Sequence, residues 1–357
     1  MAVTSYGTND PMAVKLWSKR LSVEVLKTCW ASKFMGPSTS NIIQIKDELS
    51  KSAGDKITYG LRMQLTGNGV LGDGTLEGQE ESLTVYSDAV IIDQLRHAVR
   101  SAGRMSQQRV PFTVRDEALS GLRDWWTDRI DTGWLNQICG NTAVTDVRFS
   151  GNQATINCDT NHEVFVTDSG NAGTDQSIST ADTFVLSVLD KAVERARTLT
   201  PAIRPITISG KPMYAAFLHP YQVTDLRTNT STGQWLDIQK AAMTGGEVDD
   251  NPIFEGSLGV YNGVILHSDN RITLGVNSAT PTSSVANTRR AVFCGSQAAM
   301  MAFGRDNGPE RFTWVEELFD YENELGVSAG LIFGLKKAVY NSTDYATIVM
   351  ATYAAQH

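Results

Sequence analysis

The chain has 357 residues, a formal net charge of −8 and 41% hydrophobic residues. This length is enough for two domains, or for one elaborate domain with a substantial core. The acidic balance argues against a dedicated nucleic-acid-binding protein, and no apolar run is long enough to cross a membrane. The N-terminus lacks the pattern of a signal peptide, and the 4 cysteines are far apart, which favours free thiols in a reducing compartment.

Residues 13–34 have the spacing of a loosely amphipathic helix, with Trp17, Leu21 and Val25 on its apolar side. This part is basic within an acidic chain, and its cationic residues are Lys15, Lys19, Arg20, Lys27 and Lys33. We interpret the cationic side as a solvated face, with contact to nucleic acid or to a partner as the alternative. Residues 38–55 are polar and are predicted to form an extended arm that reaches the next segment.

Residues 56–87 are predicted to form a long hairpin, around which the rest of the chain is organised. In the first strand every second residue is apolar, namely Ile57, Tyr59, Leu61, Met63 and Leu65. A glycine-rich stretch follows, and a shorter strand returns through residues 83–86. A lone hairpin is only marginally stable in water, so the chain's own body or a neighbouring copy must cover the apolar row.

The hairpin tip also contains a misleading motif. Gly67, Gly69 and Gly72 have the GxGxxG spacing of a dinucleotide-binding turn. That turn requires a helix directly afterwards, whose N–H groups hold the pyrophosphate. The glycine-rich residues that follow do not start a helix, and Glu80 and Glu81 would repel phosphate. We therefore expect a flexible tip and no bound cofactor.

Two helices are predicted after the hairpin. The first spans residues 88–102, on the basis of an apolar stripe that Gly103 ends. The second spans residues 114–139, and Thr113 caps it. Its packing face is predicted to include Leu122, Trp125, Trp126 and Ile130. Its opposite face is predicted to be solvated or to contact another subunit, and that face carries Arg115, Arg123, Asp124, Asp128, Arg129 and Asp131.

The remaining chain alternates between strand and helix patterns. Residues 141–178 are polar and read as a surface excursion, and a helix is predicted to follow through residue 196. From Pro205 onward, strands alternate with helices, including one near residues 235–242, which favours an inserted α/β unit. The last strands, to residue 353, are predicted to complete a sheet on the long helix. The fold class is therefore α+β.

No short stretch of the sequence contains a recognisable catalytic motif. The adjacent acid pairs Glu80–Glu81 and Glu316–Glu317 would point to opposite faces of a strand, so neither pair converges on a substrate. The five histidines lie far apart, with no metal-binding spacing. We therefore expect a structural protein without catalytic residues, metal or cofactor. The alternatives are a hydrolase-like enzyme with an inserted α/β domain, and a tail or adhesin binding protein.

The order of these parts resembles the major capsid proteins of tailed phages, which share the Hong Kong ninety-seven phage fold, and in particular its N-four-type branch. The motifs that carry the resemblance are GDGTLEGQEESL (Gly72–Leu83), RVPF before the tryptophan helix, AFLHPYQVTDLR (Ala216–Arg227), YNGVIL (Tyr261–Leu266), and the closing GLKKAVYN and DYATIVMATY. The resemblance spans nearly the whole chain. The polar residues 141–178 are the departure from it.

The resemblance implies a protein that assembles into pentamers and hexamers of an icosahedral head around double-stranded DNA, after assembly in the bacterial cytoplasm. It implies the following parts: an N-terminal arm (1–55), an extended loop (56–87), a peripheral domain in two pieces (88–204 and 305–357) and an axial domain (205–304). The hairpin would contact a neighbouring subunit through Arg62, Glu77, Glu80 and Glu81. The helix at 114–139 would be the spine of the peripheral domain. Portal, scaffold and decoration proteins are the further partners implied.

Overall fold

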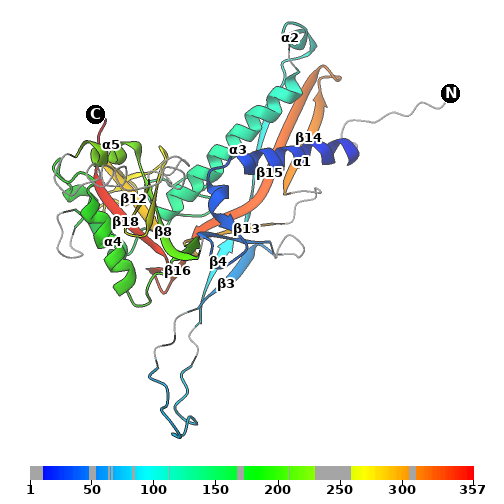
Figure 1. The fold of residues 1–357 in the computed structure, drawn as a ribbon. Helices are drawn as coiled ribbons and strands as arrows, with labels where there is room; N and C mark the ends of the chain where they lie inside the picture. The colour runs from blue at the N-terminus through cyan, green and yellow to red at the C-terminus, as the bar shows by residue number, and fades with distance from the viewer. Residues whose placement is uncertain are drawn as a thin grey trace.

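The computed structural model describes residues 11–47, 54–62, 65, 67–82, 85–111, 113–166, 173–208, 210–229, 259–304 and 311–357. The side chains of residues 11–15 and of Arg62 also lie outside this description, as does the helix predicted near residues 235–242. Within the described residues, two large sheets organise the molecule. The long helix α3 (Val114–Ile138) runs along one sheet and ends beside the other (Figure 1).

The first sheet has six strands in the order β1-β2-β13-β15-β14, with β5 also paired to β15. These strands are β1 (Met35–Gly36), β2 (Ile43–Lys46), β5 (Asp93–Arg100), β13 (Ala299–Phe303), β14 (Phe312–Phe319) and β15 (Glu324–Lys337). Because β15 has 14 residues, it pairs with β13 near its C-terminal end and with β5 over the rest. The helices α3 and α1 (Pro11–Thr28) pack on this sheet.

The second sheet has eight strands in the order β6-β18-β12-β8-β10-β9, with β11 paired to β12 and β7 paired to β8. These strands are β6 (Glu163–Phe165), β7 (Ile206–Ile208), β8 (Lys211–Leu218), β9 (Gly259–Tyr261), β10 (Val264–Ser268), β11 (Leu274–Val276), β12 (Ser284–Cys294) and β18 (Thr347–Tyr353). The helices α4 (Leu186–Thr198) and α5 (Pro220–Thr228) lie in the same lobe (Figure 1).

The remaining elements are short. A separate hairpin pairs β3 (Lys56–Arg62) with β4 (Val85–Ile91), and another pairs β16 (Val339–Tyr340) with β17 (Thr343–Asp344). The helix α2 (Arg104–Gln108) follows β5. Single 3-10 turns are η1 (Ala31–Phe34), η3 (Val147–Phe149), η4 (Thr160–His162) and η5 (Asp175–Ser177).

The predicted helix at residues 88–102 is wrong. The segment forms the end of β4 and all of β5, and β5 joins β15 through eight residue pairs. Its apolar residues fit a helical stripe, but a short apolar run does not separate helix from strand by periodicity alone. Pairing with the long strand β15 decided the outcome, as tertiary context commonly does for strands.

The placement of the last strand is also corrected. Strand β18 does not complete the sheet on α3, because it pairs with β12 in the second sheet. The described residues of 141–178 are likewise not only a surface excursion: β6 pairs with β18, and His162 and Asp175 are buried. Some polar residues of this segment, such as Arg148 and Gln176, are exposed, whereas others belong to a buried charged network.

The centre of that network is Arg290 on β12, which is 2% exposed. Its Nε donates to Asp175 at 2.6 Å, and its Nη2 lies 3.3 Å from Glu163. Its Nη1 donates to the carbonyl oxygens of Cys139 and Gly140, where α3 ends. A cation is favourable at the C-terminal end of a helix dipole. Burial raises the pKa of the Glu163 carboxyl to about 7, although Arg290 opposes the rise.

The prediction that Asp131 lies on the outer face of α3 is also wrong. It is 1% exposed, and it accepts hydrogen bonds from Cys29 Sγ and from the backbone N–H groups of Trp30 and Ala31. The two N–H groups lie at the start of η1, where a helical turn leaves its first N–H groups without internal partners, so the carboxylate holds the chain just after α1 stops. The N-terminal helix therefore ends at Thr28, short of the predicted residue 34.

Candidate assembly surfaces

The base of the extended hairpin is held by its own chain. Strands β3 and β4 form seven residue pairs, and Ile57, Tyr59 and Leu61 are buried. The Tyr59 hydroxyl donates to Asp88 at 2.8 Å, and Lys336 of β15 forms an ion pair with the same carboxylate. Of the two covers expected for the apolar row, it is the chain's own body that covers the first three residues.

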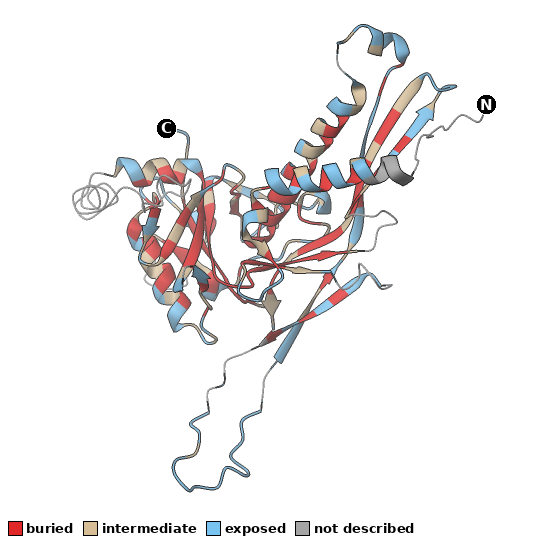
Figure 2. Ribbon diagram, turned by 45° about the vertical axis from the view of Figure 1, so that its right-hand side comes forward, coloured by how far each residue is buried: buried red, intermediate tan, exposed pale blue. Residues whose placement is uncertain are grey.

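The hairpin tip, by contrast, extends away from the body (Figures 1 and 2). Leu71 is 94% exposed and Leu76 is 59% exposed. Of the predicted contact residues, Glu77, Glu80 and Glu81 are exposed, whereas the side chain of Arg62 lies outside the description. The tip therefore presents leucines and carboxylates without burying them in its own chain.

Two of these carboxylates also shape the tip. Glu81 accepts a hydrogen bond from the backbone N–H of Gly67 at 2.6 Å, and Glu80 accepts one from Gly78 at 2.7 Å. Gly78 has a φ of 86°, a left-handed conformation that glycine adopts without strain. The described residues of the tip contain no helix, so the GxGxxG spacing does not form the helix-capped phosphate turn.

Helix α3 divides its predicted packing residues into two groups. Leu122, Trp126 and Ile130 are buried, and the Trp126 ring meets Phe312 edge-on with centroids 5.2 Å apart. Trp125 is only partly buried and stacks on His97 of β5, with centroids 4.5 Å apart and planes 15° from parallel. The sequence pattern did not separate these two tryptophans, which are adjacent and lie on different sides of the helix.

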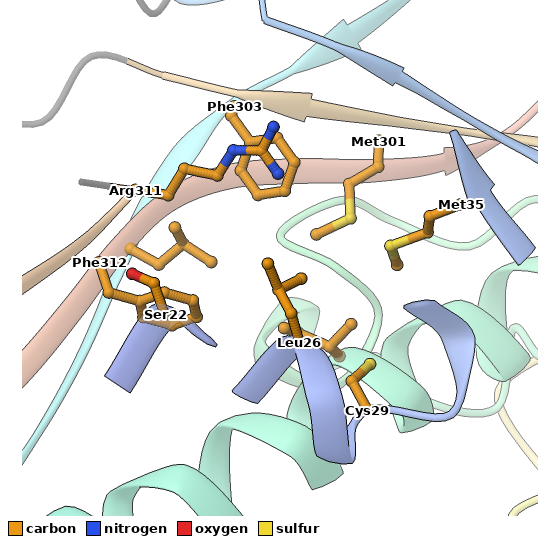
Figure 3. A pocket seen from close by; sticks show the side chains of 10 residues that line it. Ser22, Leu26, Cys29, Met35, Met301, Phe303, Arg311 and Phe312 are labelled. Carbon is orange, nitrogen blue, oxygen red and sulfur yellow. The ribbon is translucent and has the colours of Figure 1, made fainter. Parts of the chain in front are cut away.

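An apolar pocket lies between α1 and the first sheet (Figure 3). Its lining includes Leu26 from α1, Cys29 just after α1, Met301 and Phe303 from β13, and Arg311 just before β14. Arg311 lies over the Phe303 ring, 4.2 Å from its centroid, and pairs with Asp47. Burial raises the pKa of the Cys29 thiol, and Asp131 adds to the rise, so this thiol is a poor nucleophile.

Among the described residues, no group of three or more histidines, cysteines, aspartates or glutamates could hold a metal ion. No helix in the described part of the chain is long and apolar enough to span a membrane.

The family model for phage capsid proteins matches residues 5–356. The chain belongs to this phage capsid protein family. The capsid of Ralstonia phage GP4 is similar to it, with a TM-score of 0.78, 32% identity and coverage of 99% of both chains. The major capsid protein of Pseudomonas phage KPP25 is 28% identical over 360 residues, which cover 94% of this chain and 91% of that protein.

A third relative shares the fold. The Cyanophage Pam1 capsid has a TM-score of 0.71 and 21% identity, over 93% of this chain and 94% of that one. The α+β architecture is thus that of the Hong Kong ninety-seven phage fold, and the protein is a major capsid protein that forms the phage shell. Its relatives are structural capsid proteins. The assignment to the N-four-type branch stays a prediction.

The face of α3 that was predicted to be solvated or to contact another subunit carries three arginines, which could pair with the acidic hairpin tip of a neighbouring capsid protein. Each already has a contact within its own chain: Arg115 pairs with Glu316 at 2.6 Å, Arg123 pairs with Asp124 at 2.8 Å, and Arg129 lies over the Phe149 ring. These contacts would have to be replaced before the arginines could bind a neighbour. They are therefore weaker candidates than the sequence suggested.

The lysines of α1 and η1 remain available for contacts. Lys19 and Lys27 of α1 and Lys33 of η1 are exposed and form no ion pair among the described residues, whereas Arg20 pairs with Glu24 at 3.0 Å. The side chain of Lys15 lies outside the description. The described part of α1 therefore carries a cationic outer surface, while Leu21 and Val25 are buried against the body.

Proposed function

We propose that this capsid protein assembles into pentamers and hexamers, which close into an icosahedral head around double-stranded DNA, and that it has no catalytic role. The observation that supports this most is a hairpin whose base is anchored in the body while its tip exposes leucines and glutamates. A tip of this kind gains stability only by contacting another molecule. The family assignment gives no support to the alternatives of a hydrolase-like enzyme or an adhesin.

The purified capsid protein should form closed shells, alone or together with other virion proteins. Light scattering across a range of concentrations, beside negative-stain microscopy, would detect them. A protein that never exceeds a small oligomer under any of these conditions would contradict the proposal. Portal, scaffold and decoration proteins are the partners that such a head would use, and assembly would take place in the bacterial cytoplasm.

The division into arm, extended loop, peripheral domain and axial domain is also a proposal. The strand order of the two large sheets supports assigning three strands to the other domain. Strand β13 pairs with β15 and β2, so it belongs with the peripheral domain. Strands β6 and β18 pair with each other in the second sheet, so they belong with the axial domain.

We further propose that the basic surface of α1 faces the interior of the head, where it meets packaged DNA weakly and without sequence preference. Its exposed lysines support this, because they stand out in a chain of net charge −8. Such contacts are electrostatic and weaken as salt rises.

A labelling experiment tests the position of α1. All 4 native cysteines are buried, so Lys19→Cys adds a single exposed thiol. A bulky polyethylene-glycol maleimide should modify this thiol in dissociated subunits but not in intact heads. Rapid modification of intact heads would place α1 on the outer surface.

A further inference from the structure

The buried charged network around Arg290 joins the two large sheets. Arg290 on β12 and Glu163 on β6 belong to the second sheet, whereas Lys337 is the last residue of β15 in the first. Asn157 connects them: its side-chain oxygen accepts from Arg290 Nη1 at 2.8 Å, and its backbone carbonyl accepts from Lys337 Nζ at 3.2 Å. We call these four residues, together with Asp175, the inter-sheet cluster.

The inter-sheet cluster places two carboxyl groups against one guanidinium. Arg290 reaches both Asp175 and Glu163, and the side chain of Asp175 is 0% exposed. Asp175 Oδ2 also accepts from the Val276 N–H at 2.6 Å. Asp175 Oδ1 is buried and has no hydrogen-bond donor among the described residues. A buried acceptor without a donor is costly, and a proton on Glu163 would supply the donor.

The cations of the neighbouring elements contact other groups. Lys191 and Arg195 of α4 donate to backbone carbonyls of β6. Lys337 pairs with Asp344 of β17 at 2.7 Å. Among the described residues, the ion pair that the Glu163 carboxylate forms is the one with Arg290. A single cation therefore faces the two carboxyls.

Two further titratable groups near Glu163 are neutral at pH 7. The Cys158 thiol donates to Glu163, and burial raises the pKa of this thiol. His162 Nδ1 lies 3.4 Å from Asp159, and burial lowers the pKa of the His162 imidazole. Neither group gains or loses charge as the pH rises from 7 to 8, so the change of charge in this range belongs to the two carboxyls.

The surroundings of Glu163 keep a proton on it up to neutral pH. Burial raises the pKa of its carboxyl to about 7, against the effect of Arg290. Asp175 adds to the rise, both through its charge and by accepting a hydrogen bond from the protonated form. Two carboxyls that share a buried site resist being ionised together.

We propose that Glu163 and Asp175 share one proton at and below neutral pH, and that its release to solvent at higher pH loosens the joint between the two sheets. The ionised pair places two negative charges on Arg290 and leaves Asp175 Oδ1 without its donor. Arg290 also holds the Cys139 and Gly140 carbonyls, so the change reaches the end of α3. This inference concerns the folded subunit and does not depend on shell closure.

Unfolding across pH tests the shared proton. Glu163→Gln keeps a donor for Asp175 and an acceptor for Arg290 but cannot ionise. The pKa of Glu163 is raised in the folded state, so its stabilising effect is complete below the ordinary glutamate pKa and is lost as pH rises to about 7. From pH 5 to pH 8, the unfolding equilibrium constant of the parent should therefore rise by about tenfold or more relative to this variant.

Urea unfolding of unassembled subunits at each pH would measure this ratio. Glu194→Gln is the matched control, because it removes an exposed carboxylate from the adjacent helix α4 and should follow the parent. A ratio of parent to Glu163→Gln that stays constant between pH 5 and pH 8 would overturn the proposal.

Infrared spectroscopy of the parent detects the proton even if the variant does not fold. A protonated-carboxyl band should be present at pH 6, disappear at pH 8 and shift when the glutamate carboxyls carry ¹³C. If no glutamate band titrates in this range, the shared proton does not exist.

Hydrogen exchange tests the loosening of the joint. At pH 8, residues 139–163 should exchange faster in the parent than in Glu163→Gln, whereas the two proteins should match at pH 6. Strand β14, which lies away from the inter-sheet cluster, should exchange equally in both proteins at either pH. Equal exchange of residues 139–163 at pH 8 would show that the proton does not control the joint.

Discussion

Deleting Gly67–Gly78 is expected to leave the capsid protein folded but unable to close shells. These residues form the exposed tip of the hairpin, whereas the hairpin is held to the body by its base, through Tyr59, Asp88 and Lys336. Ten residues would still join Arg62 to Val85, which is ample for a hairpin loop. Circular dichroism should therefore match the parent, while sedimentation should show no shells.

Charge variants at the same tip separate the carboxylates from the shape of the loop. Replacing Glu77, Glu80 and Glu81 by glutamine keeps an acceptor oxygen for the Gly67 and Gly78 N–H groups but removes the charge. Replacing them by lysine reverses it. A single exposed ion pair contributes only about 0–1 kcal/mol, but the term repeats at each equivalent contact of a shell. Assembly should weaken from parent to glutamine to lysine, most clearly at low salt, where screening is least.

Two results would show that the hairpin is not a contact between subunits. One is a deletion variant that unfolds, because the tip would then stabilise its own chain. The other is a deletion variant that forms normal shells. If the lysine variant assembles as well as the parent at low salt, the leucines rather than the carboxylates make the contact.

Local sequence patterns correctly predicted the elements that are determined by interactions between residues close together in the chain. The alternation at Ile57, Tyr59 and Leu61 predicted β3, and the Thr113 cap predicted the start of α3. In each case the deciding interaction lies within a few residues, so it leaves a signal in the sequence.

The errors came from interactions between distant residues. Strand β5 depends on β15, more than two hundred residues later, and its own apolar spacing equally suits a helix. Asp175 is buried because Arg290 pairs with it, and Asp131 because the chain turns back to it after α1. A polar side chain looks the same in sequence whether it faces solvent or a buried partner.

The candidate contact residues were predicted only in part. The acidic hairpin tip was recognised, since a glycine-rich loop with several glutamates has no place in a core. The pairing of Arg115 with Glu316 was missed, because the two residues lie 201 positions apart in the sequence.

Trp126→Ala should destabilise the subunit by about 3–5 kcal/mol, the usual range for removing a large aromatic side chain from a core. Trp126 is fully buried, and its ring meets Trp125, Phe312 and Phe333. The alanine variant would leave a cavity between α3 and the first sheet. Urea unfolding of unassembled subunits, followed by tryptophan fluorescence and circular dichroism, would measure the loss.

Trp125→Ala is the matched control, since it removes the adjacent side chain from the same helix. Trp125 is only partly buried, and its main contact is the stack on His97, a kind of interaction that contributes about 0.5–1.5 kcal/mol beyond burial. Trp126→Phe should fall between the two alanine variants, because the indole N–H of Trp126 has no acceptor to lose among the described residues. Equal losses for both alanine variants, or a Trp126→Ala variant as stable as the parent, would show that α3 does not carry the packing of this sheet through Trp126.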